Sequence, residues 1–339
     1  MRSEFQSALR KVTINERLSF EEAYEANKYI LSGEAEEGEI GAFLAALKTK
    51  GEHPQEIAGM AKAMRELSSI DFDVEDSFDN CGTGGDYSNS FNISTTSAFV
   101  LAGAGVKVAK HGNRSISSKC GSADLLSELG VNIDLSKEKV KKLIDEVGIA
   151  FLYAPTMHPR MKYVMKVRKN LGIPTVYNIL GPLTNPLNPS NQLIGVYKKE
   201  LVKDLCEALK LLGKKRALVI NGDNRLDEGT LDGDNYCAFL VNGEVNNMVI
   251  KSSDYGIDRI GLESLAGGDA KENSRITLSI LNGEKSPYRE AVVFNSALGI
   301  FASGVCEDIR SGIDMAKDIL DSGKAMEKLE SLIEESNKI

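Results

Sequence analysis

The sequence predicts an α/β protein in which a small all-helical domain precedes a larger α/β domain with a mostly parallel central sheet. Up to about residue 70 the apolar side chains recur at helical spacing, whereas beyond it short β-branched or apolar runs alternate with helical patterns. Such alternation is typical of a parallel sheet covered by helices. With 339 residues, 42% of them hydrophobic, the chain is long enough for both domains.

The N-terminal part is expected to contain three helices in succession. Ser19 and Glu22 have the spacing of a capping box, so a helix is expected to begin there and to run to Gly33. The apolar residues of the next helix are Ile40, Phe43, Leu44 and Leu47. Gly51 is expected to end that helix, and Pro54, which the first turn of a helix tolerates, opens the third.

An acidic segment, residues 71–76, is expected to link the helical part to the sheet. Strands are expected at 106–109, 149–152 and 217–220. Helices are expected at 122–129, 137–147 and about 199–212, and a charged amphipathic helix at 324–339. The proline-rich stretch 181–189 is expected to be neither helix nor strand and to act as a rigid connection.

The run Cys81-Gly82-Thr83-Gly84-Gly85-Asp86, here called the glycine loop, indicates a phosphate site. Three glycines in four positions let a bulky anion approach the backbone N–H groups. Ser94 and Thr95 then open an apolar run that predicts a helix with a hydroxyl cap, whose N-terminus suits phosphate. The spacing fits neither the P-loop nor the dinucleotide fingerprint, and taken alone the loop is equally compatible with an ordinary glycine turn.

Three charged segments are further candidates. Lys110 and Arg114 lie in a polar stretch that either wraps an anion or is a solvated basic loop. Asp227-Glu228 offers the hard oxygen ligands that magnesium prefers, although an acid-rich loop by default is a solvated turn. Arg168, on a predicted helix, is either a surface cation or a fork for a planar carboxylate. The segments at 81–86, 110–118 and 227–228 all follow candidate strands, so they are expected to converge on one edge of the sheet.

Composition narrows the class of partner. A formal net charge of −8 argues against nonspecific binding to nucleic acid and favours a small anionic ligand. The five cysteines include no C-x-x-C pair, so neither a disulfide framework nor a zinc site is indicated. Since the sequence has neither an apolar signal core nor a long apolar run, we expect a cytoplasmic protein without a membrane segment.

The same motifs, in the same order, resemble those of the anthranilate phosphoribosyltransferase family. They are Gly82-Thr83-Gly84-Gly85-Asp86, Asn92-Ile93-Ser94-Thr95, Lys110-His111-Gly112-Asn113-Arg114 with Ser117-Ser118, and Gly121-Ser122-Ala123-Asp124. The resemblance continues through Ile40–Leu44, Ala63–Glu66, His158-Pro159, Asn178–Pro186 and Asp227-Glu228, and so covers almost the whole chain.

The resemblance implies a domain arrangement and an assembly. It places the helical domain at 1–72 with a returning segment at about 168–188, and the phosphoribosyl-pyrophosphate-binding α/β domain at 73–167 and 189–339. The active site is expected in the cleft between them. It also implies a homodimer formed through the helical domain.

The resemblance further implies transfer of a 5-phosphoribosyl group from phosphoribosyl pyrophosphate (PRPP) to anthranilate, with two Mg²⁺ ions, in tryptophan biosynthesis. The residues it assigns to PRPP are Gly82, Gly85, Asp86, Ser90, Asn92, Ile93, Ser94, Thr95, Lys110, His111, Gly112, Asn113, Arg114, Ser115, Ile116, Ser117, Ser118 and Ser122. Those assigned to anthranilate are Gly82, Asn113, His158 and Arg168. Those assigned to the metal are Ser94, Asp227 and Glu228. No general base is expected, because an arylamine is already neutral at pH 7.

The chain departs from the family pattern at three places. Ser90 stands where Thr is more common, Pro174 where Arg is common, and the acid pair lies between Asn221-Gly222 and Gly229-Thr230. Two other functions stay open at this point. One is a pyrimidine nucleoside phosphorylase, which shares the domain arrangement, and the other is a nucleic-acid-binding relative without catalysis.

Overall fold

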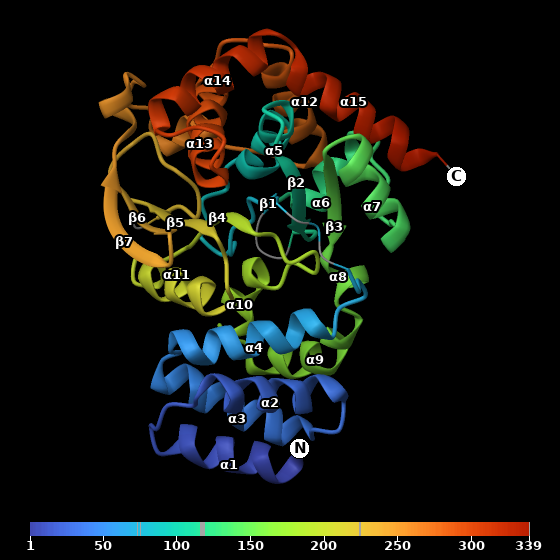
Figure 1. Cartoon of the computed structure of the whole chain (residues 1–339), viewed down its shortest axis with the longest axis vertical. Helices are drawn as coiled ribbons and strands as arrows, with labels where there is room; N and C mark the ends of the chain where they lie inside the picture. The colour runs from blue at the N-terminus through green and yellow to red at the C-terminus, as the bar shows by residue number, and fades with distance from the viewer. Residues whose placement is uncertain (73, 75, 116–118, 224, 339) are drawn as a thin grey trace.

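The computed structural model describes residues 1–72, 74, 76–115, 119–223 and 225–338. A stack of helices containing the N-terminus forms one end of the molecule, and a sheet covered by helices forms the other (Figure 1). The α/β architecture that the sequence predicts is therefore confirmed.

The N-terminal stack consists of α1 (Arg2–Thr13), α2 (Phe20–Ser32), α3 (Glu37–Lys50) and α4 (Pro54–Glu66). The predicted capping box is present: the Ser19 hydroxyl accepts from the Glu22 N–H at 3.2 Å, and the Glu22 carboxylate accepts from the Ser19 N–H at 2.9 Å. Gly33 and Gly51, both at φ 87°, end α2 and α3, and Pro54 opens α4. These local predictions are confirmed, whereas α1 had not been predicted.

Within the described residues the sheet has seven strands, in the order β3-β2-β1-β4-β5-β6-β7. The strands are β1 (Ser77–Asp79), β2 (Lys107–Gly112), β3 (Ile149–Tyr153), β4 (Asn191–Gly195), β5 (Arg216–Gly222), β6 (Asn235–Val241) and β7 (Glu244–Ile250). The first five in this order are parallel, and β6 and β7 join antiparallel at one side. The sheet is thus mostly parallel, as predicted.

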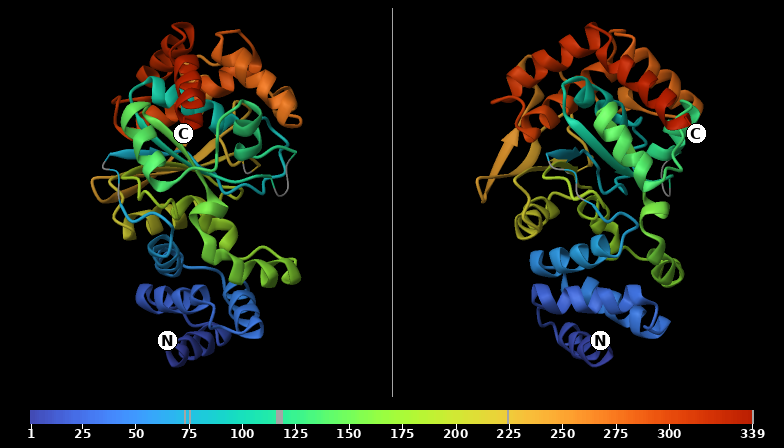
Figure 2. Two further views of the ribbon diagram at one scale, coloured as in Figure 1. Left: turned by 90° about the vertical axis from the view of Figure 1, so that its right-hand side faces the viewer. Right: turned by 45° about the vertical axis from the view of Figure 1, so that its right-hand side comes forward.

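One layer of helices covers the sheet on the side away from the N-terminal stack (Figure 2). Its members are α5 (Ile93–Gly103), α6 (Ser122–Glu128), α7 (Lys137–Glu146), α12 (Ala270–Leu281), α13 (Pro287–Ser303), α14 (Ile309–Asp321) and α15 (Lys324–Asn337). On the other side α11 (Leu201–Leu211) packs against β5, β6 and α4. One apolar core therefore runs from the N-terminal helices through α11 to the sheet, where it includes Ile194, Val219 and Ala238.

After β3 the chain returns to the N-terminal helices through α8 (Ala154–Met157), α9 (Lys162–Leu171) and α10 (Tyr177–Leu180). The Tyr177 hydroxyl donates to Asn27 Oδ1 at 2.5 Å, and Asn27 Nδ2 donates to the Met60 carbonyl at 2.7 Å. Short 3-10 turns lie at Pro159–Met161, Gly181–Leu183, Ser252–Tyr255 and Leu262–Leu265. The returning helices are therefore tied to α2 and α4 by buried hydrogen bonds.

Three local predictions were wrong. The proline-rich stretch begins with a 3-10 turn at Gly181–Leu183, since the φ that Pro182 fixes suits a first turn. Lys110 lies on β2, which extends to Gly112, because pairing with β3 continues to Tyr153. The third concerns α5, which begins at Ile93 with Asn92 as N-cap and without a side-chain cap. The Asn92 amide is used elsewhere, donating to the Cys120 carbonyl at 3.2 Å.

None of the described helices is long and apolar enough to cross a membrane.

Candidate functional site

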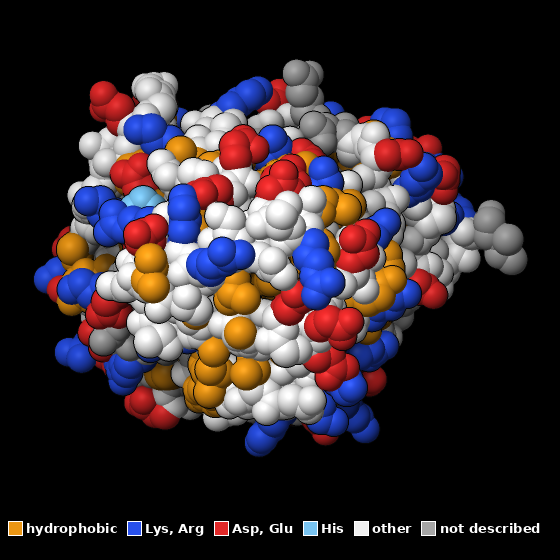
Figure 3. Space-filling view, turned by 90° about the horizontal axis from the view of Figure 1, so that it is seen from below, with side chains coloured by type: hydrophobic (Ala, Val, Ile, Leu, Met, Phe, Trp, Pro, Cys, Tyr) orange, Lys and Arg blue, Asp and Glu red, His pale blue; other side chains and the backbone are white. Residues whose placement is uncertain are grey.

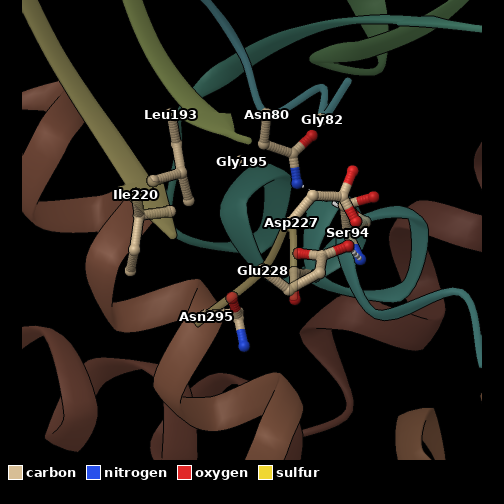
Figure 4. A pocket seen from close by; sticks show the side chains of 10 residues that line it. Asn80, Gly82, Ser94, Leu193, Gly195, Ile220, Asp227, Glu228 and Asn295 are labelled. Atoms are coloured by element: carbon tan, nitrogen blue, oxygen red, sulfur yellow. Dashed lines mark hydrogen bonds between the residues drawn. The ribbon is translucent and has the colours of Figure 1, made fainter. Parts of the chain in front are cut away.

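The acid pair Asp227-Glu228 lies directly against the glycine loop and the first turn of α5 (Figure 4). Asp227 Oδ2 accepts from the Gly84 N–H at 2.7 Å, and Glu228 Oε1 accepts from the Ser94 N–H at 3.2 Å. Asp86 Oδ2 accepts from the Asp227 N–H at 3.3 Å. The two carboxylates therefore occupy N–H groups of the kind that bind phosphate. The predicted convergence of the glycine loop and the acid loop is confirmed.

The environment of the acid pair disfavours the charged form of both carboxyl groups. Burial raises the pKa of Asp227 well above 3.8, and the neighbouring Asp86 and Glu228 raise it further. Burial also raises the pKa of Glu228 to about 7, against the opposing charge of Lys110. A cation placed between these oxygens would remove both penalties. There is little spare room, because a Cβ on Gly82 would lie 2.4 Å from Asp227 Oδ2.

Lys110 brings a buried cation to the same edge of the sheet. Among the described residues its ammonium donates only to Asn80, to the carbonyl at 3.2 Å and to Oδ1 at 3.4 Å. Asn80 Nδ2 in turn donates to the Ser94 carbonyl at 2.7 Å. Asp79, wholly buried beside them, accepts from the His111 N–H at 3.2 Å, and burial raises its pKa to about 6. The Lys110 charge is thus held in place without a direct carboxylate partner in the described structure.

Asp124 organises the loop that follows β2. Its Oδ2 accepts from the N–H groups of Ser115 at 3.0 Å and Gly121 at 2.9 Å, and its Oδ1 pairs with Arg114 at 2.8 Å. The charge of Arg114 is therefore directed at Asp124 here rather than at the glycine loop. Ile116, Ser117 and Ser118, three predicted PRPP residues, lie outside the described residues.

A second group of predicted residues lies on the returning helices or packs against them. The rings of His111 and His158 meet edge to face with centroids 5.2 Å apart, and His111 Nδ1 lies 3.2 Å from the Gly181 carbonyl oxygen. Arg168 stacks on Tyr177, 5.7 Å from the ring centroid, and donates to Asn178 Oδ1 at 3.4 Å. Within the described part of the chain no carboxylate pairs with Arg168. Burial lowers the pKa of its guanidinium, which a carboxylate partner would oppose.

The two buried histidines are expected to make stability fall in acid. Burial lowers the pKa of His111 to about 4 and that of His158 to about 3, and Lys110 opposes a charge on His111. Since unfolded histidine binds a proton below about pH 6.5, the stability that these neutral rings contribute is lost as pH falls from there towards 4.

We therefore expect His158→Gln to lose less stability than the wild type between pH 7 and pH 5. Urea unfolding at both pH values gives the free energy of unfolding of each protein. The carboxylates contribute equally in the two proteins, so the difference between their losses is the contribution of His158. Equal losses in the two proteins would contradict the prediction.

Comparison with known proteins shows to which family the chain belongs. Family models described as the helical bundle domain and the a/b domain of a glycosyl transferase family match residues 6–68 and 74–326. The anthranilate phosphoribosyltransferase of Bacillus cereus (strain B4264) is 50% identical over 332 residues, which cover 97% of each chain. The chain belongs to the anthranilate phosphoribosyltransferase family.

Solved structures of anthranilate phosphoribosyltransferases agree with this fold. The Thermus thermophilus enzyme is 38% identical, with a TM-score of 0.92 over 98% of this chain and 99% of that one. The Saccharomyces cerevisiae enzyme in complex with PRPP and Mg is 29% identical, with a TM-score of 0.90 over 100% and 99%. The yeast enzyme has also been solved in complex with 4-fluoroanthranilate.

The residues that the family resemblance assigns to the two substrates and that the structure describes fall into three places, and Asp227-Glu228 of the predicted metal site form a fourth. Along the glycine loop, the segment that follows it and the start of α5 lie Gly82, Gly85, Asp86, Ser90, Asn92, Ile93, Ser94 and Thr95. On β2, in the loop after it and at the start of α6 lie Lys110, His111, Gly112, Asn113, Arg114, Ser115 and Ser122. On the returning helices lie His158, which directly follows α8, and Arg168, within α9. The Thr95 hydroxyl donates to Ser122 Oγ at 2.9 Å and so links the first two places.

The His111 side chain contacts His158, on the side assigned to anthranilate, although the resemblance assigned His111 to PRPP. The Ile93 side chain is buried, and the backbone N–H of Ile93 donates to the Phe91 carbonyl at 2.8 Å. Neither group is directed at the glycine loop in this structure.

Several residues that support the site were not predicted from the sequence. Asp79 and Asn80 directly precede the glycine loop, so their position was an available signal. Asn221, one of the departures from the family pattern, donates to the Val196 carbonyl at 2.7 Å and so secures the end of β5. Asn295, on α13, lies 67 positions beyond Glu228 in the chain, and no local pattern marked it.

Proposed function

We propose that this chain transfers the 5-phosphoribosyl group of PRPP to anthranilate, giving N-(5-phosphoribosyl)anthranilate and pyrophosphate. The observation that carries the proposal is the acid pair seated on the N–H groups of the glycine loop and α5, in a chain of this family. The reaction displaces pyrophosphate from the anomeric carbon, so charge on the leaving group must be stabilised while the amine is held close to that carbon.

The PRPP side combines N–H donors with one buried cation. The glycine loop and the first turn of α5 supply N–H groups, and Lys110 supplies a full charge held by Asn80. The donors now used by Asp227 and Glu228 are those that phosphate oxygens would use. We infer that the two carboxylates release them to the substrate when it binds.

Magnesium fits the remaining oxygens. Asp227, Glu228 and the Ser94 hydroxyl are hard oxygen donors, and among the described residues no cation forms an ion pair with the two partly buried carboxylates. Among the described residues no cluster of three His, Cys, Asp or Glu side chains could hold a metal alone, which suits an ion that keeps water and substrate phosphates as ligands. Two ions are proposed, and when bound they would neutralise the pyrophosphate.

The acceptor side needs orientation more than proton transfer. Arg168, stacked on Tyr177, is proposed to bind the carboxylate of anthranilate. The His111 and His158 rings, which the lowered pKa values keep neutral at pH 7, are proposed to line the same acceptor side, with Gly82 and Asn113 completing the contacts. An arylamine arrives unprotonated, so no side chain has to act as general base.

A homodimer through the helical end stays a prediction, as does a cytoplasmic location. That end presents hydrophobic side chains among charged ones (Figure 3). Exposed apolar residues of its helices and connections are Ile14, Tyr163, Met165 and Ile173. A nucleic-acid partner is not proposed, given the net charge of −8.

The decisive test mixes the protein with anthranilate, PRPP and magnesium and follows the loss of anthranilate fluorescence. We expect loss that stops when a chelator is added. No loss, together with phosphorolysis of pyrimidine nucleosides, would replace the proposal with the phosphorylase. No loss together with salt-sensitive retardation of DNA in a gel would replace it with the nucleic-acid-binding relative.

A further inference from the structure

A buried asparagine on α13 forms hydrogen bonds with the backbone of the residue that directly follows the acid pair. Asn295, only 2% exposed, accepts from the Gly229 N–H through Oδ1 at 2.8 Å and donates through Nδ2 to the Gly229 carbonyl at 2.9 Å. Nδ2 also donates to the Ala291 carbonyl at 2.9 Å, one turn back on its own helix. Both polar backbone groups of the residue that follows Glu228 are thus bound by one side chain.

Asn235, on β6, holds the next residue in the same way. It accepts from the Thr230 N–H at 2.7 Å and donates to the Thr230 carbonyl at 3.0 Å and to the Ile250 carbonyl at 3.1 Å. Residues 227–230 belong to neither helix nor strand. Two buried asparagines, one from a helix and one from a strand, therefore take the place of ladder hydrogen bonds there.

The opposite side of this segment is fixed by close packing. A Cβ on Gly195, at the end of β4, would lie 1.6 Å from the Asp227 carbonyl oxygen, and one on Gly222 would lie 2.6 Å from that of Glu228. Figure 4 shows Asn295 reaching from α13 towards Glu228, across from Gly195. The acid pair is therefore enclosed between two strand ends and α13, with Asn295 forming the hydrogen-bonded side.

We propose that Asn295 is a positioning residue that fixes the direction of the Asp227 and Glu228 carboxylates for magnesium and PRPP. The inference depends on the proposed function, in which those carboxylates hold the metal. Two adjacent, partly buried carboxylates repel each other, so their backbone must be held if both are to face the same ion. Without the hydrogen bonds to Gly229, the backbone that carries Glu228 can shift, so the two carboxylates no longer face the same ion.

The test measures ligand binding rather than turnover. Calorimetric titration of PRPP into Asn295→Ala at a series of magnesium concentrations, without anthranilate, gives the magnesium concentration for half-maximal binding. We expect it to rise about tenfold over the wild type, the usual size of an outer-shell effect on metal affinity. Anthranilate binding, measured in the same preparation by its fluorescence, should be unchanged.

Asn191→Ala is the matched control, because Asn191 Nδ2 also donates to a backbone carbonyl, that of Ser303, but at the start of β4. It should keep the wild-type magnesium midpoint. Asn295→Ser serves as a second variant that keeps a polar hydroxyl but cannot reach both backbone groups of Gly229.

Each other outcome overturns the inference. A wild-type midpoint in Asn295→Ala, an equal shift in Asn191→Ala, or an equal loss of anthranilate binding would leave Asn295 a purely structural residue, as would failure of both Asn295 variants to fold. If PRPP binding to the wild type does not depend on the magnesium concentration, the proposed function is wrong. The wild-type titration gives this result before any Asn295 variant is made.

Discussion

Asp227→Asn combined with Glu228→Gln is expected to lower magnesium-dependent turnover at least about tenfold, a loss equivalent to about 1.4 kcal/mol or more of transition-state stabilisation. The amides can still accept from the Gly84 and Ser94 N–H groups that the carboxylates now use. They cannot supply the negative charge that a magnesium ion needs. Steady-state kinetics over a range of magnesium concentrations measures the effect.

The same variant should fold at least as stably as the wild type at pH 8. A carboxyl whose pKa is raised by folding contributes stability below its unfolded pKa and loses it as pH rises through the folded value, about 7 for Glu228. The variant has no such loss, so its advantage in thermal unfolding should shrink from pH 8 to pH 5. Unchanged kinetics would remove both residues from the site, and a variant that is simply unfolded would show no such pH trend.

Arg168→Ala is expected to raise the Michaelis constant for anthranilate by about ten- to a hundredfold. A hydrogen bond between charged groups contributes about 1.5–3 kcal/mol, and each 1.4 kcal/mol is a factor of ten. The guanidinium already stacks on Tyr177 and has no carboxylate partner in the described structure, so it is free to receive one. The Michaelis constant for PRPP should hardly change.

Two further variants sharpen this second prediction. Lys169→Ala removes an exposed cation from the next position on α9 and should leave both constants alone. Arg168→Lys keeps the charge but loses the planar fork, so it should recover only part of the anthranilate binding. A defect confined to PRPP would contradict the assignment of Arg168.

Features that depend on a few neighbouring residues could be read from the sequence. The Ser19 and Glu22 capping box, the glycines that end α2 and α3 and the proline that opens α4 were all placed correctly. The alternation of strands and helices gave the mostly parallel sheet, and the order of strand-end loops gave the convergence of the glycine loop and the acid pair. Each of these depends on backbone preferences or periodicity within one segment.

Side-chain partners from distant segments could not be read in this way. The sequence suggested a hydroxyl cap for α5, but the Ser94 N–H is bound by Glu228, 134 positions away. It suggested that Arg114 would add charge to the anion site, but Asp124 takes that guanidinium. A local pattern states which groups a segment offers, and it contains nothing about which other segment will supply their partners.

By itself, then, the sequence determined the fold class, the family and the residue types at the site, because local backbone preferences and motif order encode them. The tertiary structure alone decided which donors the acid pair occupies, that His111 lies against His158, and that Asn295 and Asn235 hold the backbone after Glu228. These contacts depend on how strand ends and helices meet in space. Hydrogen bonds between such separated groups form only once the core has fixed that arrangement.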